Sequence, residues 1–224
     1  MTKKTKITLS AKELELVCNK EWILTKQIII EKVYQLFGEL ANTMQRYLMH
    51  KTGALPAQVM VIGPKISKGE NYKGLPYVML DYPRYFTKDA TLAIRTFFWW
   101  GNFFSINLQL SGDYMQAATS SLQRNFSFLQ QNNYSICINP EPWHHHFGED
   151  NYVPIKNVTA TAFLNLLSDK PFVKIAKQIS LQQWDAAGQI LECHFKEMVM
   201  LLEISCPNDE RGLSPGIPII GSGL

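Results

Sequence analysis

The sequence predicts an α+β fold in which helices from both ends of the chain pack on a central antiparallel sheet. Apolar residues recur at helical spacing from 21 to 50 and again from 181 to 202. Between these two regions, from 59 to 138, short β-branched and aromatic segments are separated by Gly, Pro and Asn. We therefore expect about five strands covered by long N-terminal and C-terminal helices.

The N-terminal region is predicted to be helical from Ala11 onward. Ser10 and Glu13 have the spacing of a capping box, in which a hydroxyl and a carboxylate each satisfy an amide at a helix start. The helical stripe then consists of Ile29, Val33, Phe37, Leu40, Met44 and Leu48. Gly53 and Pro56 predict the end of the helix, because Gly permits a left-handed cap and Pro does not continue a helix.

Five strands are predicted in the middle of the chain, at residues 59–62, 75–80, 92–100, 103–110 and 134–138. The third and fourth form a hairpin near 92–110, in which Gly101 and Asn102 fit a two-residue turn. Apolar and polar residues alternate along 103–110, a pattern typical of one buried face and one wet face.

The last part of the chain is predicted to hold a helix at 113–129, a loop from 139 to 157 and two helical segments after Thr159. Ser180 and Gln183 suggest a second capping box for the final helix. Residues 1–206 are expected to form one α+β domain. The Gly- and Pro-rich residues 207–224 are expected to form an extended arm.

Composition limits the classes of protein. A chain of 224 residues with 46% hydrophobic and 18% charged residues can bury a sizeable core. Its net charge of +3 is spread along the chain, so no nucleic-acid partner is expected. The four cysteines are widely spaced, which favours reduced thiols. Neither a leader peptide nor a membrane span is predicted, so a soluble, cytoplasmic protein is expected.

Two groups of residues are candidates for ligand binding. Trp99 and Trp100 belong to an aromatic block whose rings point to both faces of the hairpin, where they form a core, a ligand pocket wall or a subunit interface. Arg84 and Arg95 have the fork geometry that grips a carboxylate or a phosphate. A structural ion pair between Asp81 and one of these arginines is the favoured alternative.

A third candidate is the Gly- and Lys-rich segment 63–74. Lys65 and Lys73, together with backbone amides, are suited to hold an anion. The segment lacks the spacing of a phosphate-binding loop, and an exposed hairpin loop is the favoured alternative.

The histidine-rich segment 143–150 is the candidate metal site. In an extended chain His144 and His146 project to the same side, and with Glu149 they offer two imidazoles and one carboxylate. The favoured alternative is a polar loop whose histidines bond to backbone and solvent, and a pH-sensitive loop is a further one. Cys193 and His194 are not expected to form a catalytic dyad, because adjacent residues diverge on a helix.

From these observations we expect a non-enzymatic protein that binds a small molecule or a protein partner, with a homo-oligomer as one form of that partner. The alternative is a metal-dependent enzyme that uses His144, His146 and Glu149. The sequence leaves open whether any reaction is catalysed and which cofactor, if any, is bound.

Overall fold

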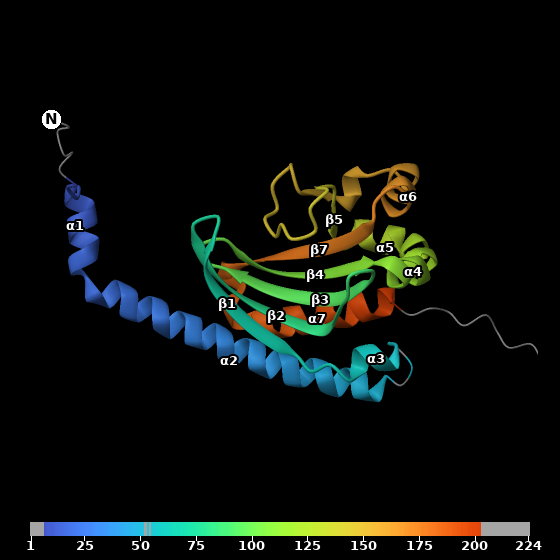
Figure 1. Ribbon diagram of the computed structural model, residues 1–224, viewed down its shortest axis with the longest axis horizontal. Coiled ribbons are helices and arrows are strands. Elements are labelled where there is room, and N and C mark those ends of the chain that lie inside the picture. The colour runs from blue at the N-terminus through green and yellow to red at the C-terminus, as the bar shows by residue number, and fades with distance from the viewer. Residues whose placement is uncertain (1–6, 52, 54, 203–224) are drawn as a thin grey trace, which may run out of the picture.

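The computed structural model describes residues 7–51, 53 and 55–202. Figure 1 shows a curved sheet with α2 and α7 beneath one face and a loop above the other, and α6 lies near β5 at one end of the sheet. The predicted α+β class is confirmed. The sheet has seven antiparallel strands in the order β1-β2-β3-β4-β7-β5-β6, rather than about five. Among the described residues, no helix combines the length and apolar character needed to cross a membrane.

The α-helices are α1 (Ala11–Cys18), α2 (Lys20–His50), α3 (Ala57–Met60), α4 (Gly112–Arg124), α5 (Phe126–Gln131), α6 (Ala160–Ser168) and α7 (Ala187–Leu201). Two 3-10 helices are η1 (Ile155–Asn157) and η2 (Leu181–Ala186). The strands are β1 (Lys65–Tyr72), β2 (Leu75–Phe86), β3 (Thr91–Trp99), β4 (Phe103–Ser111), β5 (Ser135–Cys137), β6 (Tyr152–Pro154) and β7 (Phe172–Ser180).

The predicted N-terminal capping box is confirmed. The amide of Ser10 donates to the Glu13 carboxylate at 2.7 Å, and the amide of Glu13 donates to the Ser10 hydroxyl at 3.3 Å. Asn19 ends α1 with an extended backbone (φ −92°, ψ 90°) and caps α2 by accepting from the amide of Trp22. The buried stripe of α2 consists of Ile30, Val33, Phe37, Leu40, Ala41, Met44 and Leu48.

The central strands differ from the prediction in one respect that shapes the rest of the molecule. The apolar side chains of β4 face the helices, as expected. However, the polar side chains Ser105, Asn107 and Gln109 on its other face are also buried, with exposed fractions of 1%, 2% and 4%. The prediction that this face is exposed to water is wrong, because another part of the chain covers it.

Three parts of the predicted layout are wrong in detail. Residues 59–62 were expected to be a strand, but residues 57–60 form α3, because so short an apolar run does not distinguish a strand from a helical turn. Strands β1, β6 and β7 were not predicted. The β3–β4 turn has three residues rather than two, since Trp99 pairs with Phe103.

The start of the final helix also differs. The Ser180 hydroxyl accepts from the amide of Gln182, and Gln183 has a non-helical backbone, so this segment is η2 and α7 begins only at Ala187. The segment 207–224, predicted to be an extended arm, lies outside the described residues.

Candidate functional site

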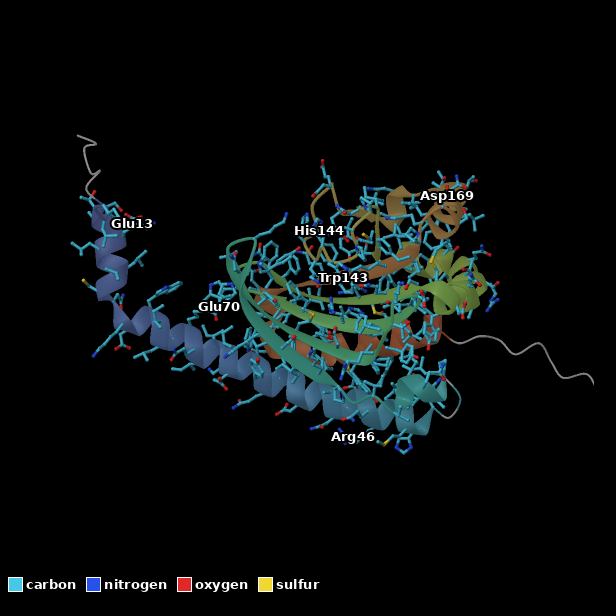
Figure 2. The ribbon with its side chains drawn as sticks, in the orientation of Figure 1. Glu13, Arg46, Glu70, Trp143, His144 and Asp169 are labelled. Carbon is cyan, nitrogen blue, oxygen red and sulfur yellow. The ribbon has the colours of Figure 1, made fainter. Side chains whose placement is uncertain are left out.

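Residues 139–151 form a loop that covers the face of the sheet opposite α2 and α7 (Figure 1). Figure 2 places Trp143 and His144 in this loop, above the strands. The side chains beneath or within it that are both polar and buried include Asp81, Arg95, Asn107, His145 and Lys174. Because buried polar groups are costly unless they are paired, the contacts of this set determine what it does.

Asp81 and Arg95 form a cross-strand ion pair at the centre of this face. Arg95 Nε donates to one carboxylate oxygen at 2.6 Å and Nη2 donates to the other at 3.0 Å. Both side chains are only 9% exposed. The predicted ion pair with Asp81 is therefore confirmed. The guanidinium also lies 5.9 Å from the ring of Phe86 and 5.7 Å from that of Trp143, which closes it off from a free ligand.

His145 lies between two basic side chains. Its Nε2 is 3.3 Å from Arg95 Nη1, and its Nδ1 is 3.3 Å from Lys174 Nζ. The same lysine nitrogen donates to the backbone carbonyls of Pro142 at 2.9 Å and His144 at 2.6 Å. Two carbonyls and one imidazole of the loop thus meet a single amine of β7.

The donor and acceptor roles in this contact follow from arginine, which donates only. Nε2 of His145 must accept from Arg95, so a neutral imidazole carries its proton on Nδ1 and donates it to Lys174. An amine that accepts one hydrogen bond and donates two is uncharged. Burial is the main cause that lowers the pKa of Lys174, to about 7, and burial is also the main cause that lowers the pKa of His145 well below its usual value. Both shifts favour this arrangement of protons.

A neutral lysine is a nucleophile in several kinds of enzyme. Here, however, the side chain of Lys174 is fully buried, and its lone pair and both hydrogens are used in contacts with the loop. We infer a structural role, in which Lys174 holds the loop against the sheet.

Tyr72, at the end of β1, makes a second attachment. Its hydroxyl accepts from the amides of His145 at 2.6 Å and His146 at 3.1 Å. The same hydroxyl lies 3.1 Å from Nδ1 of His146, whose Nε2 is 3.0 Å from the Asp150 carboxylate. When the Tyr72 hydroxyl donates to Nδ1, the imidazole carries its own proton on Nε2 and donates it to Asp150, and this hydrogen bond lowers the pKa of Asp150.

The predicted metal ligands are only partly brought together. The rings of His144 and His146 lie 5.6 Å apart, and Nδ1 of His144 is buried with no hydrogen-bond partner. Both nitrogens of His146 are already engaged, and Glu149 is exposed. Within the part of the chain that the structure describes, the donors that lie within 4.8 Å of one another and could hold an ion belong to a different group, namely Cys193, His194 and Glu197.

The predicted aromatic and arginine ligands do not converge either. Trp99 faces the loop, is 8% exposed and donates its indole N–H to the carbonyl of Tyr72. Trp100 faces the helices, with its ring 6.2 Å from that of Trp22 on α2. Arg84 donates to a backbone carbonyl in the segment before β1. The structure therefore distributes these side chains over both faces of the sheet.

The Gly- and Lys-rich segment is mostly strand β1, and only its end, Lys73 and Gly74, forms an exposed hairpin turn. Lys65 begins β1, whose backbone pairs with β2 from Lys65 to Tyr72. Lys73 lies past the other end of β1, in a two-residue turn with Gly74, and both have positive φ (49° and 84°). The two lysines thus lie at opposite ends of an eight-residue strand, too far apart to hold one anion.

The N-terminal arm, defined here as residues 7–28, was not singled out by the sequence. It projects past the edge of the sheet in Figure 1, and α1 has no buried residue. Its exposed large apolar side chains are Ile7, Leu9, Leu14, Leu16, Val17, Trp22, Ile23, Leu24 and Ile28. The signal was present in the sequence, because the apolar residues on either side of Thr25, Lys26 and Gln27 point in several directions around the helix rather than along one stripe, and apolar residues spread in this way are normally buried.

The group on α7 was missed for a different reason. Cys193 and His194 diverge as adjacent residues do, but Glu197 lies one turn further along and reaches both.

A comparison of the chain with protein-family models, with curated proteins and with solved structures finds no match.

Proposed function

We propose that this chain is a non-enzymatic protein-interaction protein that associates with a second copy of itself through its N-terminal arm. The observation that carries the proposal is the exposure of the apolar arm. Leu24 is 47% exposed and Ile28 is 57% exposed on an ordered helix that begins beyond the sheet. Contiguous exposed apolar surface of this kind marks interaction sites in folded proteins.

The two faces of the arm have different surroundings. On the inner face, Trp22 lies against Trp100 and Lys26 forms an ion pair with Glu70 of β1. The outer face carries an open groove lined by Leu24, Gln27, Ile28, Glu31, Lys32 and Gln35. This outer groove has no partner among the described residues.

The charges beside the outer groove favour a second copy as its occupant. Lys20 and Glu31 are eleven residues apart and differ by only about 20° around the helix, so they share one flank of the groove. Glu21 and Lys32 share the other flank in the same way. In an antiparallel pair related by a two-fold axis, equal flanks of the two copies meet, so each lysine faces a glutamate.

The same two-fold axis also pairs the apolar side chains at the centre of the groove. Lys20 with Glu31 and Glu21 with Lys32 both place the two-fold axis near residue 26, which brings Leu24 of one copy opposite Ile28 of the other. Residues 7–32 contain four lysines and four glutamates, so this stretch has no net charge.

The test is the molar mass of the full chain in solution, measured by sedimentation over a range of concentrations. The wild-type chain is expected to form dimers, and the double variant Leu24→Glu/Ile28→Glu is expected to be monomeric. Leu164→Glu on α6, where the leucine is 43% exposed, is the matched control and should dimerise normally.

Charge reversal tests the register. Lys20→Glu should weaken the dimer, because it places two glutamates together, and adding Glu31→Lys should restore it. A monomeric wild-type chain at all concentrations would exclude self-association. A dimer unaffected by the groove variants would place the interface elsewhere.

The small-molecule site at Trp99, Trp100 and the nearby loops stays a prediction, as does metal-dependent catalysis at the histidine loop. One observation favours the second of these, namely the buried and unpartnered Nδ1 of His144. Metal binding there requires His146 to exchange its contact with Asp150 or with Tyr72 for the ion.

A further inference from the structure

We propose that Cys193, His194 and Glu197 on α7 bind a zinc ion. One ligand atom from each residue lies within 4.8 Å of the others. A thiolate, an imidazole and a carboxylate are the three kinds of donor that zinc takes in proteins. This site is separate from the histidine loop, which covers the opposite face of the sheet.

The distances among the three side chains suit an ion that replaces the hydrogen-bonded proton between His194 and Glu197. Nδ1 of His194 lies 2.8 Å from Oε2 of Glu197, and Sγ of Cys193 lies 3.9 Å from Oε1 of the same carboxylate. Ligand atoms in a tetrahedral zinc site are about 3.3 to 3.8 Å apart, given zinc–ligand bonds of about 2.0 to 2.3 Å. Small side-chain rotations open the histidine–glutamate contact and close the cysteine–glutamate contact to this range.

The surroundings orient the carboxylate and leave the ion accessible. The hydroxyl of Tyr134, a fully buried side chain, donates to Oε2 of Glu197 at 2.5 Å. A hydrogen bond of this kind to a ligating carboxylate is the usual support behind a metal site. Cys193 is exposed, which provides an entry path and room for water as the fourth ligand.

One neighbour opposes the ion. Lys177 of β7 lies 5.0 Å from the ring centre of Tyr134 and interacts electrostatically with Glu197 and Cys193. Its positive charge reduces the affinity of the site for a cation. When no ion is bound, the same charge serves as the counter-charge of the Glu197 carboxylate. The variant Lys177→Met should therefore bind the ion more tightly. No such change is expected if the three residues form only a structural hydrogen-bond network.

The experiment is titration of the reduced, full-length chain with Co²⁺ as a spectroscopic substitute for Zn²⁺. One equivalent is expected to bind with the charge-transfer absorption of a cobalt–thiolate bond, and added Zn²⁺ should displace it. Cys193→Ser should abolish this absorption, whereas Cys18→Ser, which alters another exposed cysteine, should leave it unchanged. Lys177→Met should tighten binding.

Three results would overturn the proposal: no thiolate absorption at one equivalent, its survival in Cys193→Ser, or unchanged affinity in Lys177→Met. Circular dichroism of each variant checks that α7 is intact. The double variant His144→Ala/His146→Ala should bind Co²⁺ as the wild-type chain does, and a loss of binding there would assign the ion to the histidine loop instead.

Discussion

Arg95 and His145, fifty residues apart in the chain, meet at 3.3 Å beneath the loop 139–151. Because arginine only donates, this contact fixes the imidazole tautomer, and the tautomer in turn assigns Lys174 as an uncharged amine. Asp81, Arg95, His145 and Lys174 thus pair with one another and with the loop and hold it against the sheet, whereas Oδ1 of Asn107 and Nδ1 of His144 are buried without a partner. We propose interaction at the N-terminal arm because its apolar side chains are exposed.

Replacing Lys174 with methionine is expected to release the loop. The carbonyls of Pro142 and His144 then lose their donor, and leaving buried acceptors unpaired costs about 1–3 kcal/mol locally. Chymotrypsin should cut after Trp143 or Phe147 faster than in the wild-type chain, as followed by mass spectrometry. Lys156→Met, at an exposed position, is the control, and equal cleavage rates in all three proteins would contradict this role.

The pH dependence of stability should report the same lysine. Its pKa is lowered from the ordinary 10.5 to about 7 in the folded chain, so between these values the unfolded chain binds more protons. The free energy of unfolding should therefore rise with pH from about 7 to about 10.5, by at most about 1.4 kcal/mol per pH unit.

Urea unfolding of the wild-type chain and of Lys174→Met at several pH values isolates this contribution, because the other titrating groups are common to both. The difference between the two free energies should change in favour of the wild-type chain as the pH increases. A difference that stays constant from pH 7 to pH 10 would mean that Lys174 is charged in the fold.

Tyr72→Phe should loosen the loop without unfolding the sheet. The variant removes the acceptor of the amides of His145 and His146, and it keeps the ring that packs on Phe97 and Trp99. Both amides should exchange their hydrogens faster, as measured by NMR or mass spectrometry. Tyr77→Phe, in the same aromatic cluster, is the matched control.

The sequence predicted those parts of the fold in which the local pattern and the tertiary contacts agree. The helix from 20 to 50 and the hairpin near 92–110 have long apolar stripes of a single period, and both are present. Strand β7 was missed, because Val173, Ile175 and Ile179 follow Pro171 in a region whose flanks read as helical. Its residues pair with residues of β4 that lie 61 to 77 positions earlier, so this pairing leaves no local signal.

The candidate site was predictable in part for the same reason. The segment 143–150 was singled out correctly as unusual, and the pairing of Asp81 with an arginine followed from the rule that buried charges are paired. The partner that determines the chemistry of His145 is Lys174, which reaches it only because β7 lies beside β4. No spacing within the loop contains that information.

The backbone at Asn19 has a consequence for how any partner can approach. The Asn19 side chain accepts from the amide of Trp22 and caps α2. Because α1 has no buried residue, the backbone of Asn19, rather than packing against the sheet, sets the direction of α1 relative to α2. A partner that binds both helices therefore meets them at the angle that this one residue sets.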